Sequence, residues 1–283
     1  AAHLLERAGF GGTPKEISFL YRMGPKSAVN FLVNYEGIKN TNNREFDESG
    51  IFDKGLENFP PSRPAATKLA KENGEALGIK NKPSGNRPLQ PVVNKFFYWL
   101  RASKLETERL GYWWANKMLN SKRPLEEKMT LFWHNHFSTS ELKVRDYRKM
   151  LLQNSTLRKN ATSDLRTILI GVAKDPAMLT FLDAGKNIKG SPNENFAREI
   201  MELFTMGEGH YSEKDIREAA RAFTGWDSEN LKFLIKSSLH DNNSKVFLGN
   251  TGNFDGEEII DLILKQETTS EFIVKKLYIN FVY

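Results

Sequence analysis

The 283-residue sequence lacks cysteine, long hydrophobic runs and the common catalytic signatures. Without cysteine, disulfide bonds, thiolate metal ligands and cysteine nucleophiles are excluded within this sequence. No apolar run reaches the roughly 18 residues of a membrane-spanning helix. The serine-hydrolase pattern Gly-x-Ser-x-Gly and the Gly-Lys-Ser/Thr ending of a phosphate-binding loop are also missing. These absences leave two broad classes, a binding or assembly domain and an enzyme that relies on histidine and carboxylate side chains.

The net charge of +6 is concentrated in one part of the chain. Residues 60–125 carry 13 Lys and Arg against 4 Asp and Glu, interleaved with aromatic residues. Such a composition can serve nucleic-acid binding. No RNP, zinc-finger or basic-zipper pattern accompanies it, and amphipathic helices with solvated lysines have the same composition. Nucleic acid is therefore not the expected partner.

The clearest helix signals begin at Ser191. With Ser191 as N-cap, Pro192 lies at the first helical position and Glu194 completes a capping box. This helix is expected to end near Met206, before two glycines. A second helix, capped by Ser212, is expected to follow, so that the pair forms a helical hairpin.

Hydrophobic periodicity along the chain predicts a mainly α protein, a multi-helix globular domain in which residues 1–283 form one domain. Residues 37–64 are polar, rich in asparagine and broken by prolines, which indicates an irregular loop or insertion. Val92 to Leu119 predicts one broken helix or two consecutive helices. An alternating pattern predicts a small β-hairpin near 231–249.

Five phrases follow one another along the chain: HLLERAGFGGTP, LFWHNHF, DPAMLTFLD, NENFAREIMELFTMGEG and YSEKDIREAARAFTGW. Together they resemble the bacterial family catalogued as domain of unknown function 1800, over nearly the whole chain. The resemblance implies no established activity. It does imply an exported or periplasmic location and a sulfatase-like protein, encoded nearby, as a partner. Because members of that family are usually longer, we expect this chain to be a fragment, truncated at both ends.

His134 and His136 form a candidate metal site, since two imidazoles and a carboxylate can bind Zn²⁺ or Fe²⁺. If their helix continues to Phe137, the two side chains point about 200° apart and cannot share an ion. His136 then packs in the core, and His134 lies on the polar side near Glu127. If the helix ends at Phe132 or Trp133, both histidines can converge on a metal from a loop.

The polar face of the helix that begins at Ser191 carries a second candidate. Glu199 and Glu202, spaced i and i+3, can aim two carboxylates at one ion or act as acid and base at a glycosidic bond. His210, beyond the glycine turn, can join them as a ligand. A solvated salt-bridge ladder through Arg198 explains the same charges without any function.

This polar face is also expected to line a cleft shared with His136. Asn195 and Glu199 flank the apolar stripe, from which side chains can reach a partly buried space. Glu199 should then be partly buried, and its pKa should be abnormal unless a cation pairs with it.

The dipeptide His240-Asp241 is the third candidate, because such a pair can bind a metal. The turn preference of aspartate explains it equally well. Two functions therefore remain open. The absence of a complete catalytic set favours an extracytoplasmic binding or assembly module. The alternative is a metal-dependent hydrolase that uses these histidines with the paired glutamates and a divalent metal as cofactor.

Overall fold

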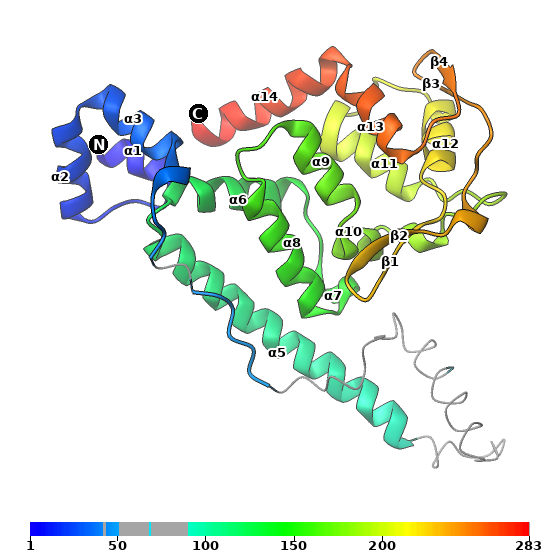
Figure 1. Cartoon of the computed structure of the whole chain (residues 1–283), viewed down its shortest axis with the longest axis horizontal. Helices are drawn as coiled ribbons and strands as arrows, with labels where there is room; N and C mark the ends of the chain where they lie inside the picture. Colours follow the sequence, from blue (N-terminus) through cyan, green and yellow to red (C-terminus); the bar gives the residue numbers. More distant parts are fainter. Residues whose placement is uncertain (42–43, 51–67, 69–89, 283) are drawn as a thin grey trace.

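The computed structural model describes residues 1–41, 44–50, 68 and 90–282 (Figure 1). For residues 90–97 it describes the backbone, and for the others it describes the side chains as well. The described chain is mainly helical, as predicted, with two small antiparallel sheets. In chain order the helices are α1 (Ala2–Arg7), α2 (Pro14–Met23), α3 (Pro25–Val33), η1 (Tyr35–Gly37), α5 (Gln90–Asn120), α6 (Pro124–His136), α7 (Glu141–Val144), α8 (Tyr147–Lys159), α9 (Leu165–Ala173), α10 (Pro176–Phe181), η3 (Ala184–Lys186), α11 (Asn195–Met201), η4 (Glu202–Met206), α12 (Glu213–Ala222), η5 (Ser237–Leu239), α13 (Gly256–Leu264) and α14 (Glu267–Phe281).

Helices α1 to α3 form a small unit at one end of the molecule (Figure 1). Thr13 caps α2, because its hydroxyl accepts a hydrogen bond from the N–H of Glu16 and the Glu16 carboxylate accepts one from the N–H of Thr13. Gly24, with a φ of 77°, separates α2 from α3. The unit has its own buried core, made of Leu5, Leu20, Ala28 and Leu32.

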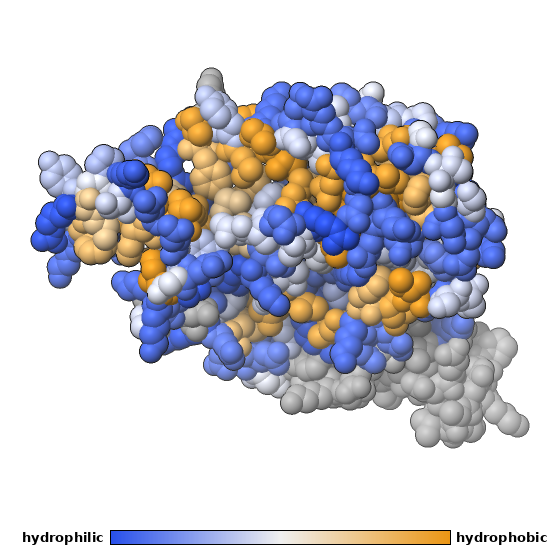
Figure 2. All heavy atoms as spheres, turned by 45° about the horizontal axis from the view of Figure 1, so that its top comes forward, coloured by the Kyte–Doolittle hydropathy of each residue, from blue (hydrophilic) through white to orange (hydrophobic). Residues whose placement is uncertain are grey.

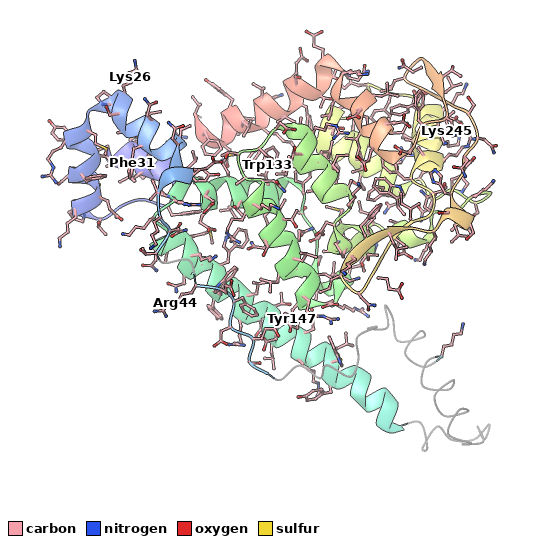
Figure 3. All side chains as sticks on the ribbon, viewed as in Figure 1. Lys26, Phe31, Arg44, Trp133, Tyr147 and Lys245 are labelled. Atoms are coloured by element: carbon pink, nitrogen blue, oxygen red, sulfur yellow. The ribbon has the colours of Figure 1, made fainter. Side chains whose placement is uncertain are left out.

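Helix α5 is continuous over 31 residues, so the expectation of a broken helix or two helices is wrong. Its internal glycine, Gly111, costs roughly 1 kcal/mol, which is too little to interrupt so long a helix. The irregular segment 44–50 runs beside α5 (Figure 3), where Trp113 and Arg109 donate side-chain hydrogen bonds to its backbone carbonyls. Most of the remaining loop predicted at 37–64 lies outside the described residues.

Helix α6 lies between two buried environments. One side carries Trp133 into the main core, which α8 to α14 complete. On the other side, Glu127 is only 1% exposed. Its carboxylate accepts hydrogen bonds from Arg158 at 2.8 Å and from the indole of Trp114 at 3.0 Å. The side near Glu127 is polar, as expected, but it is buried, because the arginine supplies the charge that lets this carboxylate be buried.

The β structure predicted near 231–249 is confirmed, and it consists of two hairpins. Strand β1 (Trp226–Glu229) pairs with β2 (Lys232–Ile235), and β3 (Lys245–Phe247) pairs with β4 (Asn250–Gly252). Each hairpin has a two-residue turn, which is the shortest connection between antiparallel strands.

Helix α11 begins later than its capping signals predicted. Ser191 forms an isolated bridge with Ile188, and the first helical residue is Asn195. The side chain of Asn193 accepts from the N–H of Asn195, while Asn187 accepts from the N–H of Asn193. These bonds hold the chain extended before the helix. The predicted hairpin with α12 is present, and Ser212 caps α12 as expected.

Helix α14 packs across the main core and buries Ile273. Its outer side exposes Val274, Tyr278 and Ile279. Figure 2 brings this face forward and shows hydrophobic residues at the surface among hydrophilic ones. Among the described helices, none is both long enough and apolar enough to cross a membrane.

Candidate functional site

The two histidines of α6 lie in different surroundings, because the helix continues to His136. His134 packs edge-on against Trp114, with 5.0 Å between ring centroids. Its Nδ1 atom is buried and has no hydrogen-bond partner within the described part of the chain. Burial lowers the pKa of His134. The helix therefore directs the two imidazoles apart.

His136 connects three elements. Its Nδ1 accepts from the Lys276 ammonium of α14 at 3.1 Å, so Nε2 carries the hydrogen and donates to the Phe204 carbonyl at 2.9 Å. Phe204 belongs to η4, a π-helical turn of the kind often found at functional sites. Burial, and then the Lys276 charge, lower the pKa of His136 to about 4. The imidazole is therefore neutral at physiological pH.

The predicted carboxylate pair makes separate contacts. Glu202 accepts a 2.7 Å hydrogen bond from the Tyr211 hydroxyl. Glu199 is half-buried, and burial together with the Glu202 charge raises its pKa. Arg198 pairs with Glu213 at 2.8 Å rather than with Glu199. The raised pKa of Glu199 thus comes first from burial and second from repulsion by Glu202, and the cleft expected beside His136 stays a prediction.

The remaining predicted ligands do not join this pair. His210 is exposed, and Asn195 donates to the Leu182 carbonyl at 3.0 Å. Within the described residues, no group of three or more His, Asp and Glu side chains is arranged to hold a metal ion. A pocket beside His136 is lined by Phe132, Asn135, His136, Lys276, Ile279 and Asn280. Glu199 does not line it.

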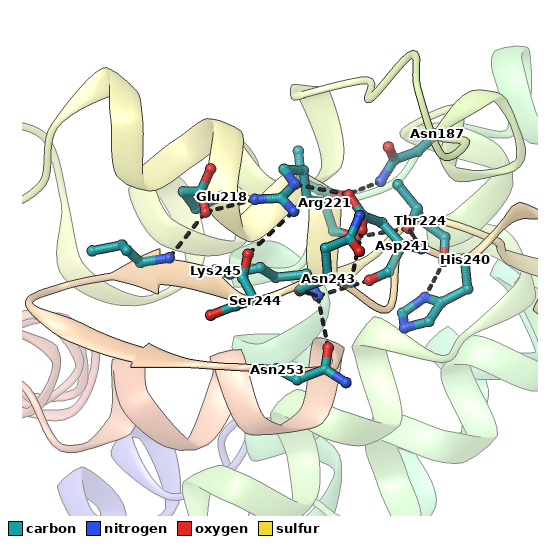
Figure 4. A network of polar contacts seen from close by, with 12 residues as sticks. Asn187, Glu218, Arg221, Thr224, His240, Asp241, Asn243, Ser244, Lys245 and Asn253 are labelled. Carbon is teal, nitrogen blue, oxygen red and sulfur yellow. Dashed lines mark hydrogen bonds and ion pairs between the residues drawn. The ribbon is translucent and has the colours of Figure 1, made fainter.

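His240 and Asp241 belong to a polar network that ties β3 to α12 (Figure 4). Asp241 accepts from Arg221 at 2.8 Å, and its backbone carbonyl accepts from the buried Lys245 ammonium at 2.7 Å. His240 donates from Nδ1 to the Thr224 carbonyl at 2.8 Å. These hydrogen bonds fix the local backbone, which favours the structural explanation of this dipeptide.

A cavity with several charged lining residues lies where the tip of the β1–β2 hairpin meets α7, α8 and α10. We call it the hairpin-tip pocket, and its volume is ≈ 330 Å³. It is lined by Val144, Asp146, Arg148, Lys149, Leu179, Thr180, Asp183, Gly185, Lys186, Asp227, Ser228, Glu229, Asn230 and Leu231. None of these residues was predicted as a site residue.

Most charges in the hairpin-tip pocket are paired. Asp146 binds Arg148, Asp183 binds Lys186, and Asp227 binds Lys236 outside the lining. These contacts neutralise the three aspartates. Two charged lining residues have no ion pair within the described residues.

Lys149 and Glu229 are those two charges. The Lys149 ammonium donates to the Thr180 hydroxyl at 2.7 Å, and the described chain offers it no carboxylate within ion-pair distance. Burial lowers the pKa of Lys149, against the opposing effect of nearby aspartates. Glu229, at the exposed rim, has no ion pair among the described residues. The pocket thus offers one free cation and one free anion.

Backbone strain is concentrated at this pocket. Five non-glycine residues in the described chain have positive φ, and four of them line the pocket or adjoin it: Arg145, Asp183, Asn230 and Leu231. Leu231 is the least expected. It occupies the second central position of a two-residue hairpin turn, with φ 62°, where glycine is the usual residue. Such a conformation costs an L-residue roughly 1–2 kcal/mol.

Comparison with protein families identifies the chain. The model of the family described as Protein of unknown function (DUF1800) matches residues 3–283. The chain belongs to this family. Comparisons with curated proteins and with solved structures gave no match.

The sequence of this DUF1800 chain gives little indication of the hairpin-tip pocket. Its walls come from residues 144–149, 179–186 and 227–231, three segments that are far apart along the chain. One local signal was available, since a leucine follows Asn230 where a hairpin turn usually has glycine. Recognising it required the register of the hairpin, which the alternating pattern alone did not define.

Proposed function

We propose that this chain is a binding domain whose hairpin-tip pocket holds a small zwitterion, such as a free amino acid or the end of a short peptide. The concentration of left-handed residues around the pocket carries this proposal. Strained backbone persists where the surrounding structure overdetermines it, and such positions cluster at ligand sites. Four of the five such residues in the described chain line this cavity or adjoin it.

The two unpaired charges support a ligand that carries both a carboxylate and an ammonium group. Lys149, with one hydrogen bond to Thr180, has further donors for a carboxylate. Glu229 at the rim has free acceptors for an ammonium group. The three aspartates do not prevent a carboxylate from approaching Lys149, because Arg148, Lys186 and Lys236 neutralise their charges. A volume of ≈ 330 Å³ lies within the range of small-molecule pockets.

A titration tests this function. The ¹⁵N-labelled chain is titrated with a mixture of free amino acids and, separately, with acetate, which lacks the ammonium group. We expect saturable shifts at the amides of residues 227–231 with the amino acids and weaker ones with acetate. Lys149→Met should abolish them. Lys189→Met, a change at an exposed lysine outside the lining, should leave them intact.

The absence of saturable shifts, or equal shifts in Lys149→Met, would contradict the proposal. A location outside the cytoplasm and a sulfatase-like partner rest on the family resemblance and stay predictions. The metal-dependent hydrolase also stays a prediction, and within the described residues no group of three or more His, Asp and Glu side chains is placed to hold its metal.

A further inference from the structure

A second cavity, with fewer charged side chains in its lining, lies between the α1–α3 unit and the junction of α5 with α6. We call it the seam pocket, and its volume is ≈ 410 Å³. Its apolar lining includes three aromatic rings. The full lining is Leu5, Phe10, Gly11, Gly12, Thr13, Glu16, Phe19, Leu20, Phe31, Leu32, Ile38, Met118, Leu119, Ser121, Lys122 and Pro124.

The loop between α1 and α2, which forms one wall of the seam pocket, packs closely against its neighbours. A β-carbon on Gly9 would stand 2.8 Å from the Cβ of Pro124, and one on Gly12 would stand 2.4 Å from the Cδ1 of Leu5. The loop between α1 and α2 is therefore already as close to its neighbours as glycine allows. The cavity is partly open to solvent, and a concave site with mostly apolar lining residues and a few polar groups is typical of small-molecule binding sites.

Within the described residues, the polar side chains that line the seam pocket have hydrogen-bond partners, with one exception. Thr13 and Glu16 satisfy each other in the capping box of α2. The Ser121 hydroxyl accepts from Asn40 and from the N–H of Arg123. The ammonium of Lys122 has no hydrogen bond or ion pair among the described residues, although its charge slightly lowers the pKa of Glu16. Within the described residues, the pocket therefore combines mostly apolar lining side chains with one cation that has no ion pair.

We propose that the seam pocket binds a fatty acid, with its alkyl chain among the aromatic and aliphatic side chains and its carboxylate beside Lys122. Burial of an alkyl chain supplies most of the affinity, because each buried CH₂ contributes about 0.8 kcal/mol. The Lys122 charge then selects an anionic end over a neutral one. This site is independent of the hairpin-tip pocket and takes a ligand of a different class.

Decanoate and decanol, both below their aggregation concentrations, serve as probes for the full chain in isothermal titration calorimetry. We expect saturable binding of decanoate, and weaker binding of decanol. Lys122→Gln should weaken decanoate binding two- to fivefold, as expected for one exposed ion pair, and should leave decanol binding unchanged. Lys122→Arg should restore the preference for decanoate.

A substitution within the cavity tests the location. Met118→Trp adds volume from a half-buried position in the lining, and it should weaken binding of both probes at least tenfold. Leu142→Trp, at a residue 77% exposed and outside the lining, is the matched control and should change neither affinity. Thermal unfolding of each variant verifies that it folds. Non-saturable uptake, or binding that Met118→Trp does not affect, would show adventitious partition only and overturn the proposal.

Discussion

The carboxylate of Asp227 lies 3.1 Å from the point where a β-carbon on Gly185 would stand. This close approach brings the β1–β2 hairpin against η3. It also places Asp227 where Lys236 and the N–H of Ser228 bind it. The absence of a side chain at Gly185 therefore helps to shape the hairpin-tip pocket.

Gly185→Ala should move Asp227 and disturb the pocket. The contact of 3.1 Å is tighter than a side-chain carbon normally makes, so the carboxylate must shift by a few tenths of an ångström. We expect a loss of roughly 0.5–1.5 kcal/mol in the free energy of unfolding, within the usual range for one substitution, and weaker amino-acid binding. Gly111→Ala is the control, because nothing lies within 4 Å of its β-carbon. It should stabilise α5 by about 0.5–1 kcal/mol in urea denaturation.

Asp175 should make stability depend on pH. Burial raises its pKa to about 7, and its Oδ2 atom has no hydrogen-bond partner in the described chain. Between about pH 4 and 7 the unfolded chain has lost this proton while the folded chain keeps it, so this contribution to stability declines as pH rises. Above pH 7 the decline stops.

Asp175→Asn should remove that dependence, since asparagine can still cap α10 by accepting from Ala177 and Met178. In urea unfolding, the free energy of unfolding of the variant minus that of the original chain should be larger at pH 8 than at pH 4.5, by an amount on the order of 2–4 kcal/mol. Contributions from other groups cancel in this difference. An identical difference at the two pH values would refute the assignment.

The His136–Lys276 contact predicts an effect of opposite sign. With a folded pKa of about 4, His136 stays neutral while the unfolded chain takes up a proton, so its contribution to stability is lost as pH falls from about 6.5 to 4. Lys276→Met removes the second largest cause of the low pKa. The titration of the imidazole C2–H in NMR should move upward but stay below its ordinary value, because burial remains. An unchanged titration midpoint would mean that the Lys276 charge does not lower the pKa of His136.

The local signals in the sequence predicted much of the fold. The caps at Thr13 and Ser212 and the β region near 231–249 depend on residues within a few positions of one another, and all three are present. The start of α11 was mispredicted because Asn187, outside the presumed capping box, binds the backbone of Asn193.

The candidate site was harder to predict, because it depends on long-range contacts. Glu127 was placed on the polar side of its helix, and its burial was not predicted because its partner Arg158 lies 31 residues along the chain. The hairpin-tip pocket joins three distant segments, and the charge that remains free there, on Lys149, is evident only after the other ion pairs are known. Sequence periodicity gives the buried face of a helix and does not show which charges are paired across helices.

The central claim, that the hairpin tip accepts strain in order to bind a ligand, is tested most directly by Leu231→Gly. Glycine relieves the left-handed conformation and removes a side chain from the pocket wall. Leu248→Gly relieves the corresponding turn of the β3–β4 hairpin, away from the pocket, and serves as the control. We predict that Leu231→Gly raises the thermal midpoint and weakens amino-acid binding, whereas Leu248→Gly leaves binding unchanged. An unchanged or lower midpoint for Leu231→Gly, with unaltered binding, would contradict the account.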